Sequence, residues 1–192
     1  MENIAIIGFS GTGKSTVAKA VADILGWELV DTDADIVRRA GAPIARIFQT
    51  HGEAAFRRME RQTVQEACAG HRRVIAAGGG AVMDPQNRKA MEERAFLVCL
   101  EARPETIYRR LREQGQGPID PEERPLLSGP DPLGRIRDLK AQRQPTYALA
   151  HWTVHTDSLS IAEVAQEVVR AWRTFWASDG KAQAPFAGSP DL

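Results

Sequence analysis

Residues 8–15 combine glycines, a lysine and hydroxyl side chains in an order that suits the binding of phosphate. They read GFSGTGKS and match the pattern G-x-x-x-x-G-K-[ST]. Glycines let successive backbone N–H groups point inward, and these groups bind phosphate oxygens together with the N-terminus of a following helix. Lys14 can reach the β and γ phosphates, and the Ser15 hydroxyl can ligate Mg²⁺. The segment predicts a nucleoside triphosphate site, and a plain glycine-rich turn is the alternative.

Two aspartates, Asp31 and Asp33, follow the next apolar segment and are separated by one residue. In open α/β sheets, ligands bind beyond the carboxyl ends of the strands, which is where both carboxylates are expected to lie. The spacing leaves a second interpretation open, in which Asp33 is only the N-cap of the next helix.

Glycines and arginines further along the chain are also candidates for a binding site. Gly78 to Gly80 are three successive glycines, which pack poorly in a strand but suit a place where a ligand approaches the backbone, with a tight turn as the alternative. Arg57 lies on a predicted helix with Glu60 three residues later, close enough for the acid to hold the guanidinium. Arg58 is adjacent, and an arginine on a helix commonly lies on a solvated face, so spacing does not choose between Arg57 and Arg58.

Alternating strands and helices must position these residues. Short apolar runs predict strands at residues 3–8, 29–31, 73–77, 95–100 and 153–156. Helical spacing of apolar residues predicts helices at residues 14–25, 33–40, 43–50, 52–69, 84–91, 132–147 and 160–176, with another that begins near Pro104. This alternation implies βαβ units and a mainly parallel sheet, so the predicted fold class is α/β.

The composition narrows the classes of function. The chain has 192 residues with 25 Lys+Arg and 25 Asp+Glu, so its formal net charge is zero and gives no overall reason to expect a nucleic acid or an anionic membrane as partner. No apolar run approaches the roughly 18 residues of a membrane span, and the glycines that begin at Gly8 leave no room for a signal peptide. Cys68 and Cys99 match no metal or redox spacing and are expected to be buried thiols, so the cytoplasm is the expected compartment.

The chain length predicts one compact domain, which we place at residues 1–176. Residues 114–132 contain three glycines and five prolines among charged residues, and this loop is too long for an ordinary connection. Residues 177–192 are rich in Ala, Gly, Ser, Pro and Asp and lack periodicity, so we expect a flexible C-terminal tail.

The order of these segments resembles the shikimate kinase family, a group of P-loop kinases similar in fold to the nucleoside monophosphate kinases. Besides residues 8–15, the resemblance is carried in chain order by DTD at 31–33, GE at 52–53, FRRME at 56–60, GGGAV at 78–82, ERPLL at 123–127, Arg143 and Tyr147. The match covers residues 4–170, and apart from the P-loop only the set of motifs is specific.

The resemblance implies a fold and a reaction. The fold has three layers, with helices on both sides of a parallel sheet of about five strands. Residues 33–61 would bind the acceptor, and residues 114–132 would form a mobile lid. The reaction would be the ATP-dependent phosphorylation of the 3-hydroxyl of shikimate, which gives 3-phosphoshikimate and ADP in the biosynthesis of chorismate and the aromatic amino acids.

The resemblance also assigns roles to individual residues. ATP would be bound by Gly11, Thr12, Gly13, Lys14, Ser15 and Thr16, by Arg110 near the adenine and by Arg124 on the lid. Mg²⁺ would be held by Ser15 and Asp31. Shikimate would be bound by Asp33, Arg57, Gly79, Gly80 and Arg143, with the arginines on its carboxylate and Asp33 on its reacting hydroxyl. The catalytic residues would be Lys14, Asp33 and Arg124.

Two rival functions stay open at this point. One is a kinase for another small anionic polyol such as gluconate, and the other is a nucleotide-binding regulator that has lost its acceptor site. Every polar position of the acceptor set is filled, and the combination of Asp-x-Asp, triple glycine and Arg-Pro-Leu-Leu is not expected in a gluconate kinase. The stretch between Arg110 and Arg124 is longer than in compact family members, so it departs from the pattern. We expect a monomeric enzyme with small-molecule substrates and no nucleic acid or membrane partner.

Overall fold

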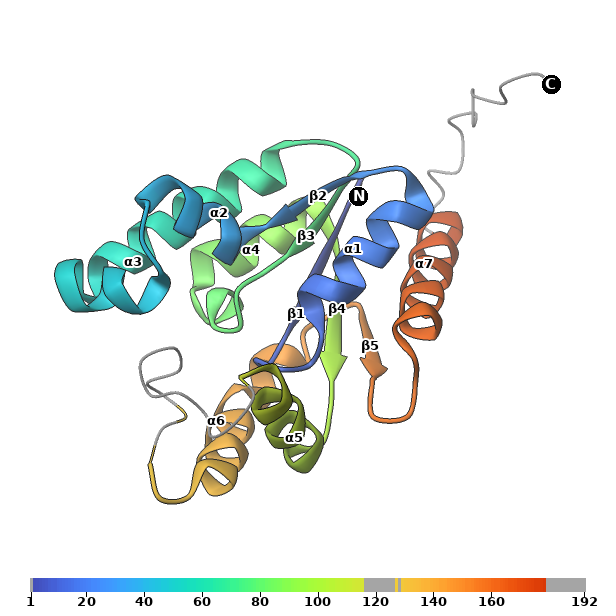
Figure 1. Cartoon of the computed structure of the whole chain (residues 1–192). Coiled ribbons are helices and arrows are strands. Elements are labelled where there is room, and N and C mark those ends of the chain that lie inside the picture. The colour runs from blue at the N-terminus through green and yellow to red at the C-terminus, as the bar shows by residue number, and fades with distance from the viewer. Residues whose placement is uncertain (1, 116–126, 128, 179–192) are drawn as a thin grey trace.

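The computed structural model describes residues 2–115, 127 and 129–178, and at its centre is a five-stranded sheet (Figure 1). Its strands are β1 (Asn3–Gly8), β2 (Glu28–Asp31), β3 (Arg73–Ala76), β4 (Ala95–Glu101) and β5 (Trp152–His155). They lie in the order β2-β3-β1-β4-β5, and every neighbouring pair is parallel. The predicted α/β class and the parallel sheet are confirmed.

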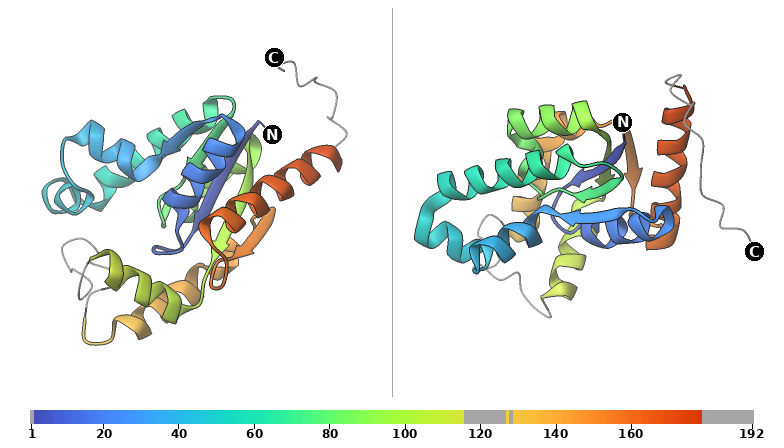
Figure 2. Two further views of the ribbon diagram at one scale, coloured as in Figure 1. Left: turned by 45° about the vertical axis from the view of Figure 1, so that its right-hand side comes forward. Right: turned by 90° about the horizontal axis from the view of Figure 1, so that it is seen from above.

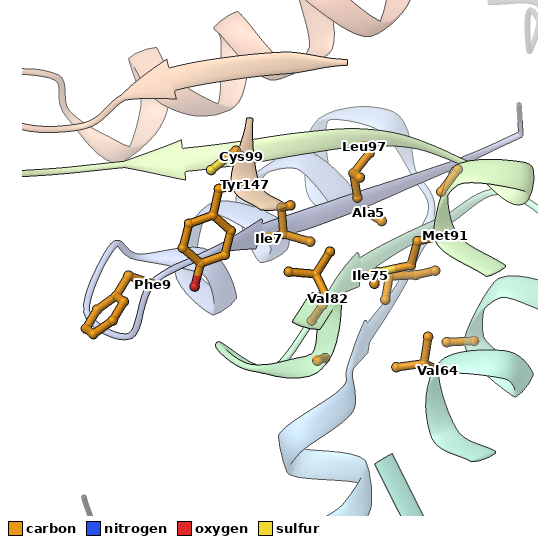
Figure 3. Close-up of a cluster of buried hydrophobic side chains, with 14 of the residues drawn as sticks. Ala5, Ile7, Phe9, Val64, Ile75, Val82, Met91, Leu97, Cys99 and Tyr147 are labelled. Atoms are coloured by element: carbon orange, nitrogen blue, oxygen red, sulfur yellow. The ribbon is translucent and has the colours of Figure 1, made fainter. Parts of the chain in front are cut away.

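Helices cover both faces of the sheet, as the two views in Figure 2 show. On one face, α1 (Lys14–Leu25) and α7 (Ile161–Ser178) pack against Ile4 and Ile6 of β1. On the other face, α3 (Ile44–Ala69), α4 (Pro85–Arg94) and α6 (Pro132–Tyr147) pack against Ala5 and Ile7, and Figure 3 shows part of this second core. Successive side chains of a strand point to opposite faces, so β1 contributes to both cores. The predicted three-layer arrangement is confirmed.

The parallel sheet brings the loops after its strands to one edge. The loop after β1 leads into α1, Asp31 ends β2 before α2 (Thr32–Ala40), and the triple glycine follows β3 and precedes the short 3-10 helix η1 (Ala81–Met83). A side chain at Gly8 would place its Cβ only 2.3 Å from the Leu100 carbonyl oxygen of β4, so the end of β1 needs a glycine. The candidate residues on these loops therefore share one edge of the sheet.

The helix boundaries follow the predictions closely, with one difference in connectivity. The two helices predicted at residues 43–50 and 52–69 form the single element α3, which has non-helical backbone at Gly52 (φ 75°, ψ 168°). The predicted break is therefore present as a kink, because a glycine adopts this positive φ without strain. The helix predicted at 84–91 continues to Arg94, and the helix near Pro104 is α5 (Pro104–Gln114).

Several expectations fall partly or wholly outside the described residues. Most of the expected lid lies there, including Arg124. The expected tail of residues 177–192 lies there from residue 179 onward, and its first two residues are the end of α7. In the described ranges, no helix is both long and apolar enough to cross a membrane. Both cysteines are buried as predicted, and burial raises the pKa of Cys68 to about 11 and that of Cys99 to about 12.

His151 is a partly buried histidine that binds the backbone of the central sheet. Its Nδ1 accepts a hydrogen bond of 2.8 Å from the Leu97 N–H, and its ring stacks on Phe96. Burial lowers the pKa of His151 below its ordinary 6.5, although the charge of Glu92 opposes this. A lowered pKa in the folded state means that the stabilisation is present above pH 6.5 and is lost as the pH falls through the folded-state pKa.

We therefore expect the free energy of unfolding to fall as the pH is lowered from 7.5 to 5, and His151→Asn to reduce this fall. Asparagine offers an acceptor near the position of Nδ1 but does not titrate. Urea unfolding at a series of pH values measures the slope, and His155→Asn, at an exposed position of β5, controls for removal of an imidazole. Equal slopes for the wild type and His151→Asn would contradict the prediction.

Candidate active site

The loop between β1 and α1 has the backbone geometry of a phosphate cradle. Gly11 and Gly13 have φ of 82° and 94°, which glycine adopts without strain. The first N–H groups of a helix have no intrahelical acceptor, and Gly13 caps α1 without a side-chain hydrogen bond to any of them. Thr12 Oγ1 donates to the Phe9 carbonyl at 2.9 Å, and Lys14 Nζ donates to the same oxygen at 3.0 Å. The loop presents N–H donors and one lysine at a single helix N-terminus, as anion binding requires.

Ser15 and Asp31 form the candidate metal pair. Ser15 Oγ donates to Asp31 Oδ2 at 2.5 Å, while Asp31 Oδ1 accepts from the Ala34 N–H at 3.0 Å and so caps α2. The alternative of Asp33 as the helix cap is therefore wrong, because Asp31 is the cap. The pair suits Mg²⁺, which prefers oxygen ligands and commonly takes one or two from protein and the rest from phosphates and water. Among the described residues, no group of three or more His, Cys, Asp or Glu side chains could hold a metal ion.

Thr32 brings Asp33 to the triple glycine. The Thr32 hydroxyl is buried, accepts from the Gly78 N–H at 3.0 Å and donates to the Ala76 carbonyl at 3.3 Å, so it joins the start of α2 to the end of β3. As a result Asp33 lies against Gly78, where an added Cβ would be 2.5 Å from Asp33 Oδ1. Sequence reasoning missed Thr32, and it included Gly78 only as part of the triple glycine, without its contact to Asp33.

The other two glycines face two different cations. A Cβ added at Gly79 would lie 3.8 Å from Lys14 Nζ and 3.4 Å from the Ser10 backbone nitrogen. A Cβ added at Gly80 would lie 3.3 Å from Arg57 Nη1. The turn formed by residues 78–80, which we call the glycine turn, therefore has Asp33 at one end, Lys14 at its middle and Arg57 at the other end.

Arg57 is held in place by two acids on its own helix. Its Nη1 lies 2.8 Å from Glu60 Oε2, and its Nη2 lies 3.2 Å from Glu53 Oε1. Burial raises the pKa of Glu60, the nearby Arg57 opposes this rise, and the charges of Asp33 and Asp84 add to it. The Arg57 side chain is only 28% exposed, whereas the adjacent Arg58 is exposed. The structure thus chooses Arg57 over Arg58 as the arginine at the glycine turn.

Arg143 reaches the same turn from α6 on the other side. Its Nη1 donates to the Gly79 carbonyl at 3.2 Å, and its guanidinium lies over the Phe9 ring, 5.4 Å from the centroid. Tyr147, one turn later on α6, donates from its hydroxyl to the same carbonyl at 2.9 Å. Arg143 therefore contacts both the phosphate loop and the glycine turn.

Arg110 lies apart from this group. Its guanidinium donates to Thr156 Oγ1 at 2.9 Å and to the Thr156 carbonyl at 2.6 Å, beyond the end of β5. The neighbouring Leu111 lies against the phosphate loop, since a Cβ added at Gly11 would be 2.9 Å from its Cδ2. Helix α5 therefore packs on the phosphate loop through Leu111, while Arg110 of the same helix binds Thr156 after β5.

These contacts describe a phosphate-binding loop whose lysine meets a glycine turn that is lined by two arginines and a carboxylate. A family model with the description shikimate kinase matches residues 10–173. The chain belongs to the shikimate kinase family. The resemblance in the sequence is thereby confirmed, and the P-loop nucleotide site and the kinase class follow from it.

Shikimate kinases from other organisms resemble the chain over most of its length. The enzyme of Symbiobacterium thermophilum is 46% identical over 168 residues, which cover 87% of this chain and 94% of that protein. That of Caldanaerobacter subterraneus is 41% identical over 172 residues, which cover 90% and 96%. The structure of the shikimate kinase from Acinetobacter baumannii in complex with shikimate has a TM-score of 0.83 and 32% identity, and covers 91% of this chain and 94% of that one.

Proposed function

We propose that this protein transfers the γ-phosphoryl group of ATP to the 3-hydroxyl of shikimate, which yields 3-phosphoshikimate and ADP. The observation that carries the proposal is the glycine turn, because one backbone segment has Lys14 of the phosphate loop beside it, Asp33 at one end and Arg57 at the other. Such a turn can bring a phosphoryl donor and a hydroxyl acceptor together, and membership of the shikimate kinase family identifies both substrates.

The donor side would use the phosphate loop and the pair Ser15–Asp31. The N–H groups of residues 11–16 and the Lys14 ammonium would bind the β and γ phosphates. Mg²⁺ would be held by Ser15 and Asp31, and when bound it supplies positive charge that neutralises charge developing on the phosphates. Arg110 would lie near the adenine, and Arg124, with the lid of residues 114–132, would close over the phosphates and exclude water.

The acceptor side would use the carboxylate and the two arginines. Arg57 and Arg143 approach the glycine turn from different helices, so they would hold the carboxylate of shikimate from two directions. Asp33 would accept a hydrogen bond from the 3-hydroxyl and aim its oxygen at the γ phosphorus. Phosphoryl transfer through a loose transition state requires positioning more than a strong base, so orientation is the main task of Asp33.

A coupled assay of ADP release with Mg·ATP tests the proposal, with shikimate, quinate and gluconate compared as acceptors. Turnover that requires shikimate is the expected result. Turnover with gluconate alone would keep the donor site and overturn the acceptor assignment. ATP binding with no turnover on any acceptor would favour the nucleotide-binding regulator.

Gly78→Ala is expected to lower kcat/KM for shikimate about 100-fold, because the new methyl group would displace the Asp33 carboxylate by roughly an ångström. The backbone of Gly78 does not have a positive φ, so an alanine there is not strained and only the 2.5 Å contact with Asp33 Oδ1 matters. The KM for ATP should stay within about twofold, since Lys14 is beside Gly79 and not Gly78. Steady-state kinetics and circular dichroism measure the effect and the fold, and unchanged shikimate kinetics would contradict the prediction.

A further inference from the structure

The carbonyl at the middle of the glycine turn has two donors from one helix. Arg143 Nη1 and Tyr147 Oη lie 3.2 Å and 2.9 Å from the Gly79 oxygen, and both belong to α6. The proposed function gives Arg143 the acceptor carboxylate to bind and gives Tyr147 no task. Figure 3 shows the Tyr147 ring in the core near Ile7 and Val82, with its hydroxyl pointing away from Cys99.

All three carbonyls of the glycine turn are hydrogen-bonded within the protein, whereas two of its N–H groups are not. The Gly78 carbonyl accepts from the Ala81 N–H and the Gly80 carbonyl from the Met83 N–H, each at 3.0 Å, so all three carbonyls are bonded to protein donors. The Gly78 N–H is bonded to Thr32. Within the described part of the chain, the N–H groups of Gly79 and Gly80 make no hydrogen bond. The turn therefore offers N–H donors, and no carbonyl, to a bound oxygen.

This arrangement depends on one peptide unit staying in its orientation. The Gly79 carbonyl and the Gly80 N–H belong to the same planar trans peptide and point in opposite directions. Because both flanking residues are glycines, that unit can rotate at low steric cost. A rotated peptide would present an oxygen where the acceptor needs a donor. Because Arg143 and Tyr147 of α6 bind the Gly79 carbonyl, the Gly80 N–H of the same peptide points away from these two donors.

Tyr147 is suited to this task because its hydroxyl stays protonated. Its side chain is 1% exposed and packs in the same core as Phe9 and Cys99. Burial raises the pKa of Tyr147 to about 12, although the charge of Arg143 opposes the rise. The hydroxyl is therefore a donor at any pH at which the enzyme would be assayed.

We propose that Tyr147 is a positioning residue of the acceptor site, whose hydroxyl fixes the Gly79–Gly80 peptide so that the Gly80 N–H faces the acceptor. Tyr147 does not touch substrate and acts through the backbone of the turn. Arg143 shares the carbonyl, is hydrogen-bonded to Tyr147 and is proposed to bind the acceptor, so Tyr147 is the donor to the carbonyl that has no proposed contact with substrate. The inference rests on the proposed function for its kinetic consequence, while the peptide orientation can be measured without any substrate.

Tyr147→Phe removes the hydroxyl and keeps the ring. We expect the KM for shikimate to rise about five- to tenfold, the loss of one hydrogen bond, with the KM for ATP and kcat within about twofold. Tyr108→Phe is the matched control, because Tyr108 packs on the same core and its hydroxyl makes no hydrogen bond to the turn in the described residues. The control should behave as the wild type. Equal increases of both KM values, or no change in either, would overturn the inference.

NMR relaxation dispersion on the substrate-free, ¹⁵N-labelled protein gives an independent test. Peptide rotation in Tyr147→Phe should add microsecond-to-millisecond exchange at the Gly80 amide that is absent from the wild type and from Tyr108→Phe. Absence of that exchange would overturn the inference whatever the kinetics show. If the wild type releases no ADP with shikimate, the proposed function fails, and the Gly80 amide still decides the role of Tyr147.

Discussion

Replacing Lys14 with methionine is expected to lower kcat about 1,000-fold, because the variant loses a preorganised positive charge at the phosphate being transferred. Lys14 Nζ lies 3.0 Å from the Phe9 carbonyl and beside Gly79, where the proposed donor and acceptor sites would meet. Methionine keeps the length of the side chain but cannot neutralise charge. The coupled assay of ADP release measures kcat, and calorimetry with Mg·ATP measures the accompanying loss of affinity.

Lys19→Met is the matched control for this variant. Lys19 is on the same helix, α1, and forms an exposed ion pair with Asp23 at 2.7 Å. An exposed pair of this kind contributes little to stability, so the control should keep nearly the wild-type kcat. A Lys14→Met variant with kcat within about tenfold of the wild type would contradict the assignment of Lys14 to the transferring phosphate.

Replacing Lys140 with methionine is expected to reduce the free energy of unfolding by about 3–5 kcal/mol. Lys140 Nζ lies 3.0 Å from Glu101 Oε2, and the two side chains are only 18% and 6% exposed. The other oxygen, Glu101 Oε1, makes no hydrogen bond within the described residues. Removal of the lysine would leave a buried carboxylate without its compensating charge, which costs more than an intact pair contributes.

Arg137→Met separates this effect from the loss of an ordinary ion pair. Arg137 is also on α6 and pairs with Glu105 at 2.7 Å, but both side chains are more than half exposed, at 56% and 57%. Its substitution should cost no more than about 1 kcal/mol. Adding Glu101→Gln to Lys140→Met should recover part of the lost stability, because the uncompensated charge is then absent. Urea unfolding measures the wild type and the three variants, and equal losses in Lys140→Met and Arg137→Met would contradict the prediction.

The strands and the phosphate loop could be predicted because each of them is formed by one continuous stretch of the sequence. The loop of residues 8–15 is contiguous, and the strands are short apolar runs whose parallel arrangement follows from the helices between them. The acceptor site could be predicted only through the family resemblance. Two adjacent arginines, Arg57 and Arg58, have the same local pattern, and only the packing of α3 determines which of them faces the glycine turn.

The contacts that were missed join residues far apart in the chain. Thr32 and Gly78 are separated by 46 positions, and Tyr147 and Gly79 by 68. A buried threonine and a buried tyrosine are ordinary core residues in sequence, and nothing in their spacing indicates that their hydroxyls meet the glycine turn. The contact between Gly78 and Asp33 could not be predicted, because it depends on the hydrogen bond between the Gly78 N–H and Thr32, which holds the start of α2 against the end of β3.

The glycine turn also bears on inhibition and on the route to resistance. A compound that accepts hydrogen bonds from the Gly79 and Gly80 N–H groups would contact main-chain atoms, which remain when the side chains that line the site are substituted. The remaining escape is to crowd the compound with a new side chain, and at Gly78 that would place a Cβ 2.5 Å from Asp33 and at Gly80 one 3.3 Å from Arg57. A substitution at Gly78 or Gly80 that excludes such a compound would also disturb Asp33 or Arg57 of the proposed acceptor site, so these two routes to resistance would reduce the proposed reaction itself.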